Sequence, residues 1–565
     1  MVLPAPPATV APHSWEVRVA EKRARCQDAI PDAWRLSPSV WQRLETPLAR
    51  HKTNLIELNI PRLSGILTDK EIDITESYDV SSLLAELAVG NLTALEVTVA
   101  FSKRAAIAQQ LTECLTETFF DQAQERARQL DALRVKGQLA GPLHGLPISI
   151  KDSFQVVGTE ATLGLVGYLG KTSEVNSCLV DMLLRLGAVL YVKTNVPQTL
   201  MTADSHNNVF GRVLNPWNTM LTAGGSSGGE GALVAFRGSP LGVGTDIAGS
   251  IRIPSLCCGT YGFKPTANRI PYGQQQDLSN PGLGFISPCA GPIANDIDAL
   301  CTFVKAVIDL QPRSIDPTAI DVPWRLLPGL ERKLKIGVLP EDALFPLHPP
   351  VRKAVADAVA LLHAQGHDLV HLSQDECHIG DSFEVAWGLF SFDSTASQIV
   401  QDGAEPLVPS VIGTIEEFER VAWKFVPNLD NLGEMERLAI LRNKRMDIMN
   451  DWHKLWTRHS LDVVIGPGAQ NTAVAHDDYN LAPYTCLLNL IDSPACIIPF
   501  GKASTTGSSE TVHKKPGQSV SPYDPELLNG APLAIQVFTS PMLDEECLSI
   551  AKMIDQCLHS YNVGF

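Results

Sequence analysis

Apolar and polar positions recur along this chain with two different periods, and the change from one to the other predicts its helices and strands. A helical repeat of about 3.6 residues runs through four segments of the first third: 81–88, 93–110, 119–135 and 177–186. Short apolar runs at 147–150 and 188–193 indicate buried strands. Helices that alternate with short buried strands are typical of an α/β domain with a parallel or mixed sheet.

The N-terminal eighty residues follow this pattern less closely. Residues 1–13 are rich in proline and alanine and are expected to be loose. Ser14 is placed to cap a helix that runs to about Ala29, where Pro31 stops it. Residues 38–78 show little periodicity, so we expect them to form an extended arm around the rest of the chain or a partner.

The second half of the chain repeats the alternation. Segment 376–460 reads as mostly helical, and 501–524 is polar and predicts a surface excursion. Further helices are predicted at 231–236, 299–308, 351–364 and 485–490, and strands at 241–244, 334–339, 368–372, 461–465, 495–499 and 533–537. No change of composition marks a linker, which favours one large domain over several. We place its limits at 81–555, after the 1–80 helix and arm and before a short tail at 556–565.

Composition and charge exclude several classes of partner. The chain of 565 residues is 45% hydrophobic and 19% charged, with a formal net charge of −17. This charge argues against nucleic acid and anionic membrane surfaces as partners. No uncharged apolar run reaches the ~18 residues of a membrane span, and the first residues do not resemble a secretory signal. We therefore expect a cytoplasmic protein whose twelve cysteines are reduced thiols, with the adjacent Cys257 and Cys258 buried.

Two glycine-rich loops and one lysine carry the candidate chemistry. Nine glycines and four serines lie between Thr222 and Arg252, and such density suits backbone that must approach a ligand closely. Ser226 lies inside Gly224-Gly-Ser-Ser-Gly-Gly229, and Ser250 ends the second loop. Lys151 follows the apolar run 146–150, where desolvation lowers the pKa of a lysine and makes the neutral amine available as a base. Each signal also has a plainer explanation. Lys151 could be a solvated surface residue, the Ser226 loop could be a turn or a phosphate-binding loop, and Ser250 could be an ordinary helix start.

Rival motifs fit the sequence less well. Gly225-Ser-Ser-Gly-Gly229 matches G-x-S-x-G, but that nucleophile elbow needs a preceding hydrophobic strand, and residues 215–222 read as a loop. No lysine follows the glycines as a phosphate-binding loop requires. The chain has no H-E-x-x-H motif or clustered metal ligands, so a metallohydrolase is not expected.

Read together, these stretches resemble the amidase signature family, and within it the fungal acetamidase-like subgroup. The resemblance is carried by Gly145-Leu-Pro-Ile-Ser-Ile-Lys-Asp152, by the Ser226 loop and by Gly244-Thr-Asp-Ile-Ala-Gly-Ser-Ile-Arg252. It extends over roughly residues 14 to 555. It implies a single large domain with a central mixed, twisted β-sheet covered by helices on both faces. It also implies an amidase that cleaves a small or medium carboxamide to a carboxylate and ammonia or an amine.

The resemblance assigns roles to individual residues. It implies that Ser250 is the nucleophile, that Ser226 bridges to it across a cis peptide bond, and that Lys151 is the base. It also implies an oxyanion hole, supporting residues and substrate contacts. The oxyanion hole is expected from the N–H groups of Ile247, Ala248, Gly249 and Ser250. Ser227 is expected to hold Lys151, and Asp246 and Arg252 are expected to brace the loop. Substrate contacts are expected from Met201, Gly225 and Thr245.

One departure from the family concerns Ala248, since many members have glycine there. Alanine adds roughly 1 kcal/mol of strain if the position requires a positive φ, and its methyl group could narrow the acyl pocket. Activity is nevertheless expected, because all three residues of the implied triad are present. Further pocket walls are expected from segment 376–440 and from the region around Asn471–Tyr484, in which Asn471, His476 and Asp477 are either substrate contacts or ordinary loop residues.

Two other functions stay open at this point. Members of the same family transfer the acyl group to another nucleophile and work with a partner subunit. A binding protein that retains the fold without activity is the third reading. For hydrolysis we expect only a small-molecule amide as partner; assembly as a homodimer is left open.

Overall fold

The computed structural model describes residues 14–276, 278–329, 332–429, 431–505 and 512–560. The prediction for 1–13, and parts of those for 501–524 and 556–565, lie outside these residues. Within them, helices and strands alternate through most of the chain as expected. The α-helices are α1 Trp15–Asp28, α2 Pro38–Trp41, α3 Ile60–Ser64, α4 Asp69–Glu76, α5 Val80–Val89, α6 Ala94–Thr112, α7 Phe120–Val135, α8 Cys178–Arg185, α9 Gly228–Ala235, α10 Arg252–Cys258, α11 Ile297–Asp309, α12 Pro349–Ala364, α13 Gln374–Cys377, α14 Ile379–Phe390, α15 Thr395–Gly403, α16 Pro409–Arg420, α17 Glu434–His459, α18 Pro483–Leu490, α19 Pro525–Leu528 and α20 Asp544–His559.

A mixed sheet of eleven strands forms the centre of the described fold. In spatial order the strands are β1 Leu115–Thr118, β3 Val189–Thr194, β2 Pro147–Lys151, β8 Leu241–Asp246, β10 Cys289–Ala294, β9 Tyr261–Lys264, β14 Ala495–Lys502, β15 Pro532–Phe538, β13 Val463–Gly466, β11 Lys335–Val338 and β12 Asp368–His371. Strand β2 runs parallel to both β3 and β8, and β11 runs parallel to both β12 and β13, while the other pairs are antiparallel. The predicted fold class, a mixed sheet flanked by helices, is confirmed.

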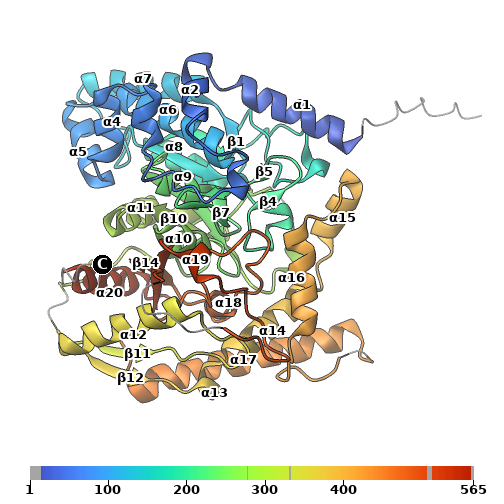
Figure 1. Cartoon of the computed structure of the whole chain (residues 1–565). Helices are drawn as coiled ribbons and strands as arrows, with labels where there is room; N and C mark the ends of the chain where they lie inside the picture. Colours follow the sequence, from blue (N-terminus) through green and yellow to red (C-terminus); the bar gives the residue numbers. More distant parts are fainter. Residues whose placement is uncertain (1–13, 277, 330–331, 430, 506–511, 561–565) are drawn as a thin grey trace, which may run out of the picture.

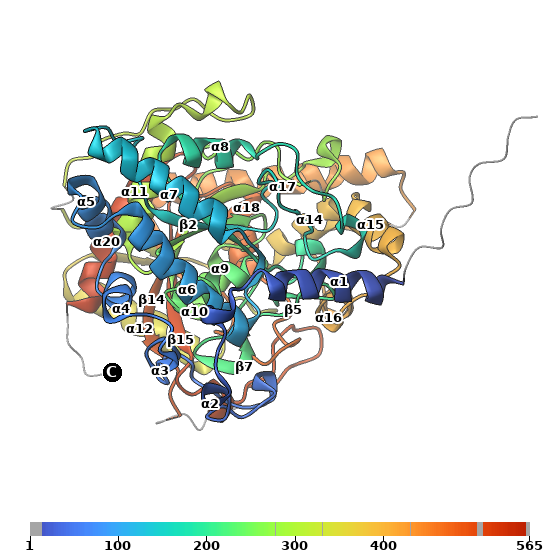
Figure 2. The same cartoon turned by 90° about the horizontal axis from the view of Figure 1, so that it is seen from above.

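The two halves of the chain build the two ends of this sheet. Helices α6, α7 and α9 pack on β2 and β3, whereas α12 and α20 pack on β14 and β15. Figure 1 shows the first-half helices at the top, the yellow β11, β12 and α12 at the bottom, and the red C-terminal elements α20 and β14 between them. Figure 2 shows α6 and α7 side by side, in agreement with their close packing.

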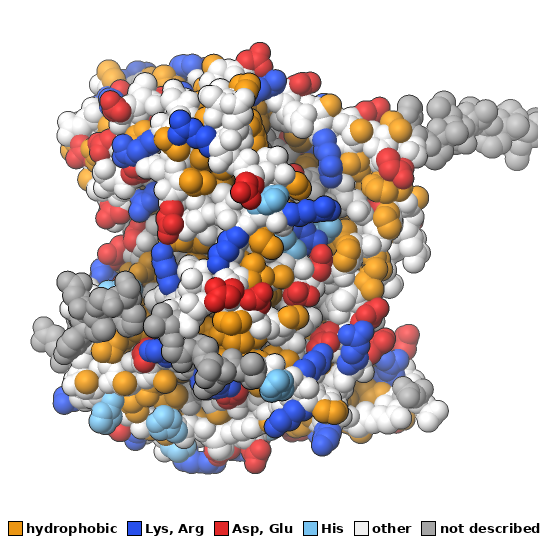
Figure 3. Space-filling model, in the orientation of Figure 1, with side chains coloured by type: hydrophobic (Ala, Val, Ile, Leu, Met, Phe, Trp, Pro, Cys, Tyr) orange, Lys and Arg blue, Asp and Glu red, His pale blue; other side chains and the backbone are white. Residues whose placement is uncertain are grey.

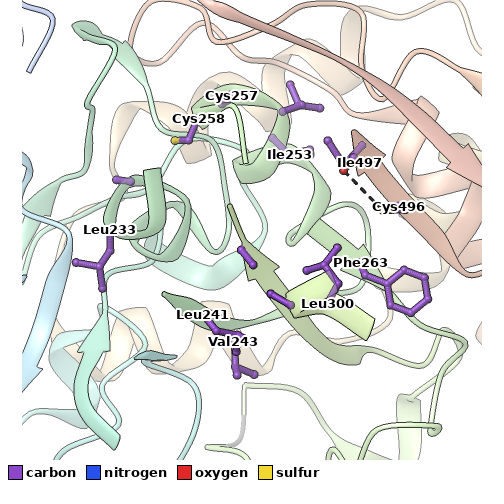
Figure 4. Packing of buried hydrophobic residues seen from close by; sticks show 14 of the residues in the cluster. Leu233, Leu241, Val243, Ile253, Cys257, Cys258, Phe263, Leu300, Cys496 and Ile497 are labelled. Carbon is purple, nitrogen blue, oxygen red and sulfur yellow. Dashed lines mark hydrogen bonds between the residues drawn. The ribbon is translucent and has the colours of Figure 1, made fainter. Parts of the chain in front are cut away.

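The hydrophobic core is continuous from the first half of the sheet to the second. Phe263 on β9 and Ile497 on β14 are both fully buried and come from strands paired across the midline. Figure 4 shows this region, in which α10 brings Cys257 and Cys258 against the sheet. Both cysteines are fully buried, which confirms the prediction of buried thiols.

The prediction of an extended arm at 38–78 is wrong in its second half. Helices α3 and α4 lie there, and α4 packs against α6. Local capping explains α4: the side chain of Thr68 accepts from the N–H of Glu71, and the Glu71 side chain accepts from the N–H of Thr68. The helix α1 is confirmed within one residue of the predicted limits.

Several short strands escaped the sequence patterns. Strands β1, β9 and β10 join the main sheet, and β10 contains Gly291 and Pro292, which weaken a strand signal. Residues 215–222, expected to be a loop, include strand β7 Asn218–Thr222, which pairs with β6 Leu214–Asn215 in a separate two-stranded sheet. A strand therefore does precede the Ser226 loop, although it lies outside the main sheet.

Acidic and basic side chains are interspersed on the face drawn in Figure 3, without a continuous basic surface. Among the described residues, the longest helices carry too many charged positions or too little apolar length to cross a lipid bilayer.

Candidate active site

Two neighbouring parallel strands bring the predicted site residues to one edge of the sheet. Lys151 is the last residue of β2, and Asp246 is the last residue of β8. The register pairs Ile150 with Val243, so the segments that follow both strands emerge side by side. Carboxyl ends of parallel strands are where open α/β sheets bind their ligands.

The Ser226 loop lies directly over this edge. The peptide bond between Gly225 and Ser226 is cis, as the family resemblance implies. A side chain at position 225 would meet the carbonyl oxygen of Thr202 at 2.4 Å, so the backbone approaches too closely for any residue but glycine. The chain then enters α9, with Ser227 as the residue before its first turn.

Lys151 and Ser226 are in direct contact. The Nζ atom of Lys151 lies 2.7 Å from Oγ of Ser226 and 2.8 Å from Oγ1 of Thr245. The lysine is completely buried. This burial lowers its pKa to about 7, against the attraction of the Asp246 and Glu230 carboxyl groups. A large fraction of Lys151 is therefore the neutral amine near pH 7, in a position to take a proton from Ser226.

Ser227 does not hold Lys151 directly, so that part of the prediction is wrong. Its hydroxyl instead contacts the backbone of Thr245, accepting from the N–H and donating to the carbonyl oxygen, both at 3.3 Å. The hydroxyl of Thr245 then makes the contact with Lys151. Ser227 acts on the lysine only through the strand end that carries Thr245.

Ser250 lies beside Ser226 and faces a cavity. Its side chain is 8% exposed, and the N–H of Ser227 donates to the Ser250 carbonyl oxygen at 3.1 Å, which ties the two loops together. Within the described residues, no hydrogen bond joins the hydroxyl groups of Ser226 and Ser250. Such contacts are often long in a ligand-free site and shorten when substrate binds.

A buried ion pair braces the Ser250 loop, as predicted for Asp246 and Arg252. Arg252 contacts both carboxylate oxygens of Asp246 at 3.0 and 3.1 Å, and it also reaches Gln536 and Asn489. Burial alone would raise the pKa of Asp246, but the Arg252 charge and its hydrogen bonds hold that pKa well below the usual range. Asp246 therefore stays ionised and fixes the loop.

The same carboxylate changes the expected oxyanion hole. The N–H of Gly249 donates to Oδ1 of Asp246 at 2.8 Å, so this group is already occupied. In the part of the chain that the structure describes, no acceptor pairs with the N–H of Ile247, Ala248 or Ser250. Three of the four predicted donors remain available, and Gly249 serves the brace instead.

Comparison with known proteins agrees with this arrangement. The profile of the family described as Amidase matches residues 96–548, most of the chain. The chain belongs to the amidase family. It is 38% identical to an amidase of Gibberella moniliformis over 547 residues, which cover 96% of this chain and 99% of that protein. It is 35% identical to an acetamidase of Emericella nidulans, over 97% of this chain and 99% of the relative.

The solved structures point the same way. A fatty acid amide hydrolase superposes with a TM-score of 0.86 at 28% identity and covers 96% of this chain and 95% of that one. A peptide amidase from Stenotrophomonas maltophilia has a TM-score of 0.63 at 20% identity over 86% of this chain and 97% of its own, a likeness of fold alone. The protein is an amide-hydrolysing enzyme of this family.

Ala248 is not strained in the enzyme, contrary to the concern raised by its sequence. Its φ is not positive, whereas the next residue, Gly249, has a φ of +130°. The left-handed conformation that excludes most side chains therefore falls on the glycine. The Ala248 carbonyl accepts from the hydroxyl of Thr485 at 2.7 Å, and its methyl group borders a cavity.

Two cavities meet at Ser250. The smaller has a volume of 40 Å³ and is bordered by Gly225 and Ala248, together with aromatic residues of α14. The larger has a volume of 340 Å³ and is bordered by Ser226, Thr245 and residues of 274–276 and 278–288. The residues that border both are Leu200, Met201, Ile247, Ser250 and Phe390. The predicted contact residues Met201, Gly225 and Thr245 thus all face one or other cavity.

Three other suggested pocket residues have different partners. Asn471 donates to the hydroxyl of Ser521 at 3.3 Å, and the Nε2 atom of His476 lies 3.0 Å from the carbonyl oxygen of Thr219. Asp477 forms an ion pair with Arg212 at 2.7 Å. None of the three borders either cavity, so they are structural, and the prediction for them is wrong. Segment 376–440 does contribute walls, through Phe383, Trp387, Phe390 and Thr414. The predicted region around 471–484 contributes as well, through Asn480, Leu481 and Ala482.

Glu230 on α9 is a buried carboxyl group that the sequence did not single out. It accepts from Ser149 at 2.5 Å and from Thr194 at 2.9 Å. Burial raises its pKa to about 8. The acidic residue next to the glycines in Gly-Gly-Ser-Ser-Gly-Gly-Glu230 was a signal that could have drawn attention to it.

Proposed function

We propose that the enzyme is a serine amidohydrolase that cleaves the C–N bond of a small or medium carboxamide through an acyl-enzyme on Ser250. The contact that carries this proposal is the 2.7 Å approach of the buried Lys151 amine to the Ser226 hydroxyl. An amine with a pKa of about 7 can accept a proton at neutral pH and return it later. The products are a carboxylate and ammonia or an amine.

The proton path runs through both serines. Lys151 takes the proton of Ser226 while Ser226 takes that of Ser250, and the Ser250 oxygen attacks the amide carbonyl carbon. On collapse of the tetrahedral intermediate, Ser226 gives its proton to the leaving nitrogen and is reprotonated by Lys151. Water then attacks the ester carbonyl, and the same relay returns a proton to Ser250. This path requires the two hydroxyl groups to approach when substrate is bound.

The developing oxyanion is best served by the free N–H groups of Ile247, Ala248 and Ser250. Removal of one preorganised donor in such a hole costs about 3 kcal/mol of transition-state stabilisation. Gly249 contributes indirectly, because its N–H fixes the loop to Asp246. No step of this mechanism uses a metal or an organic cofactor.

The names of similar proteins support amides as the substrate class. Two similar proteins over nearly the whole chain are called amidase and acetamidase, and a similar solved structure is a fatty acid amide hydrolase. Acyl transfer to a second nucleophile has no support from these names.

Active-site labelling tests the assignment. A fluorophosphonate should modify the wild-type enzyme on Ser250 and abolish release of ammonia or amine from a panel of amides. Ser250→Ala should lose both labelling and hydrolysis. Ser397→Ala, which removes an exposed serine on α15, is the matched control and should behave as wild type.

Two results would contradict the proposal. Undiminished labelling of Ser250→Ala would show that another residue is the nucleophile. Acyl transfer would be indicated instead if a second subunit copurified and if added hydroxylamine were converted to a hydroxamate while almost no substrate was hydrolysed.

A further inference from the structure

The two cavities at Ser250 differ in which catalytic groups they reach. Ser226 and Thr245 border only the larger cavity, and Gly225 and Ala248 border only the smaller one. In the proposed reaction, Ser226 delivers the proton to the leaving nitrogen. The amine half of the substrate must therefore lie on the side of Ser226, in the larger cavity, and the acyl chain must lie in the smaller one.

The two cavities also differ strongly in size. The smaller has a volume of 40 Å³ and the larger 340 Å³. A water molecule needs roughly 10–15 Å³ of such volume, so the acyl side holds only about three water-sized groups. This is room for a short acyl chain and not for a ring. The larger cavity accommodates a ring on the amine side with space to spare.

Helix α14 closes the acyl side with aromatic rings. Phe383 and Trp387 stack with their centroids 5.6 Å apart and their planes at 22°. Phe418 on α16 stacks on Trp387 at 5.1 Å and also lies 6.3 Å from Phe383, and Trp423 packs on Phe418 at 4.9 Å. Trp387 therefore belongs to a cluster of rings in mutual contact and cannot turn aside without loss of these contacts. The wall is therefore stiff, and Trp387 cannot yield to a longer acyl chain at low cost.

The lining of the small cavity also favours an apolar acyl group. Of the residues that border only this cavity, Ile253, Leu481 and Cys486 are apolar and lie beside the aromatic rings, with Thr202, Thr414 and Asn480 as polar neighbours. The larger cavity carries polar side chains as well, from Gln274, Gln276, Ser279 and Asp393. A polar or aromatic amine half can be solvated there, whereas an acyl half with a polar tail would be desolvated in the small cavity.

We propose that the enzyme selects N-substituted amides with a short apolar acyl group on a bulky amine, and that Trp387 sets the limit of acyl length. The reaction breaks the C–N bond, places the hydroxyl of water on the short acyl carbon and releases the bulky amine with its added proton. This inference rests on the proposed function, since the side that each half occupies follows from the role of Ser226.

A pair of isomeric substrates tests the selection. N-benzylacetamide and N-methyl-2-phenylacetamide contain the same atoms with the large and small halves exchanged. We expect wild-type kcat/KM to be at least about tenfold higher for N-benzylacetamide, the size of discrimination that a poor fit in an apolar pocket produces. Equal rates, the reverse preference, or labelling without hydrolysis of either isomer would overturn the inference.

Variants test the role of Trp387. Trp387→Ala should increase kcat/KM for N-methyl-2-phenylacetamide and narrow the ratio between the isomers at least fivefold. Trp456→Ala removes a half-buried tryptophan from α17, where it packs on Phe538 away from both cavities, and should leave the ratio unchanged. If Trp387→Ala does not fold, Trp387→Phe takes its place and should narrow the ratio in the same direction; an unchanged ratio in the folded variant would refute the role of Trp387.

Fluorophosphonate labelling of Ser250 separates the two proposals. Labelling and hydrolysis with the wrong isomer preference would refute only the size selection. Absence of both labelling and hydrolysis would refute the proposed function itself.

Discussion

Loss of Arg252 should destabilise the enzyme more than loss of any exposed charge. Its side chain is fully buried and contacts Asp246, Gln536 and Asn489. Arg252→Met keeps much of the volume but leaves the Asp246 carboxylate buried without its counter-ion. Breaking a buried pair in this way costs about 3–5 kcal/mol of folding free energy. We expect a loss of this size at pH 7.

The pH dependence of this loss follows from the direction of the Asp246 pKa shift. In the wild type that pKa is lowered, so the pair contributes stability above the ordinary aspartate range, and this contribution is lost as pH falls through the lowered value. Without Arg252, the pKa of Asp246 should lie above its wild-type value, because burial is then opposed only by the Lys264 charge and the remaining hydrogen bonds. The difference between wild type and Arg252→Met should therefore be largest near pH 7 and shrink as the pH approaches 4.

Urea unfolding followed by tryptophan fluorescence measures this effect at several pH values, with midpoint and slope both compared. The double variant Asp246→Leu with Arg252→Met removes both charges and should recover a large part of the lost stability, although not the activity, because the N–H of Gly249 loses its acceptor. Arg332→Met, which removes an exposed ion pair with Asp462, is the matched control and should cost less than about 1 kcal/mol. A loss below 1 kcal/mol for Arg252→Met, or a double variant no more stable than the single one, would refute the reasoning.

Three further predictions concern the loops and the buried ionisable groups. The value of kcat/KM should rise with pH, with a midpoint near pH 7, and become constant above it, because Lys151 must be neutral to accept a proton. A midpoint below pH 5 would exclude this lysine as the base. Gly249→Ala should reduce kcat at least about 100-fold, since φ is +130° at this position and the added carbon would lie 2.2 Å from the Thr485 hydroxyl. Ala248→Gly is the control and should keep kcat within about threefold of wild type. Similar kcat values for both variants would contradict the assignment of the strained position to Gly249. Glu230→Gln should become more stable relative to wild type as pH rises from 5 to 8. The pKa of Glu230 is raised to about 8 in the folded enzyme, so the wild-type unfolded chain releases a proton that the folded enzyme retains, and the wild type loses stability over this range. Unfolding midpoints that change in parallel for the two proteins would show that Glu230 is ionised in the fold.

Much of the candidate site was predictable because its signals are local in the sequence. A lysine directly after a short buried apolar run is expected at a strand end, and the glycines around Ser226 and Ser250 mark backbone that approaches other atoms closely. The alternation of helices and strands predicted the α/β fold for the same reason, since each element shows its own period. The helices at 60–76 were missed because their evidence is a capping box and one proline and not a long apolar stripe.

Only the tertiary structure decided which hydrogen-bond donors and acceptors at the site pair with each other. Sequence spacing gives the order of Asp246, Gly249 and Ser250, but it cannot show that the Gly249 N–H donates to the Asp246 carboxylate. Sequence spacing also cannot show that the hydroxyl that contacts Lys151 belongs to Thr245, whereas that of Ser227 contacts the Thr245 backbone.

The same distinction applies to substrate selection. The cavity walls include Phe383 and Trp387 of α14, more than 130 residues beyond Ser250, and the volume left beside Trp387 depends on how that helix packs on α17 and α18 and on Phe418 of α16. The sequence by itself determined which residues are able to do chemistry, because reactivity belongs to residue type and local backbone. Which hydrogen bonds are free and how large each cavity is depend on contacts between distant segments, and those exist only once the chain has folded.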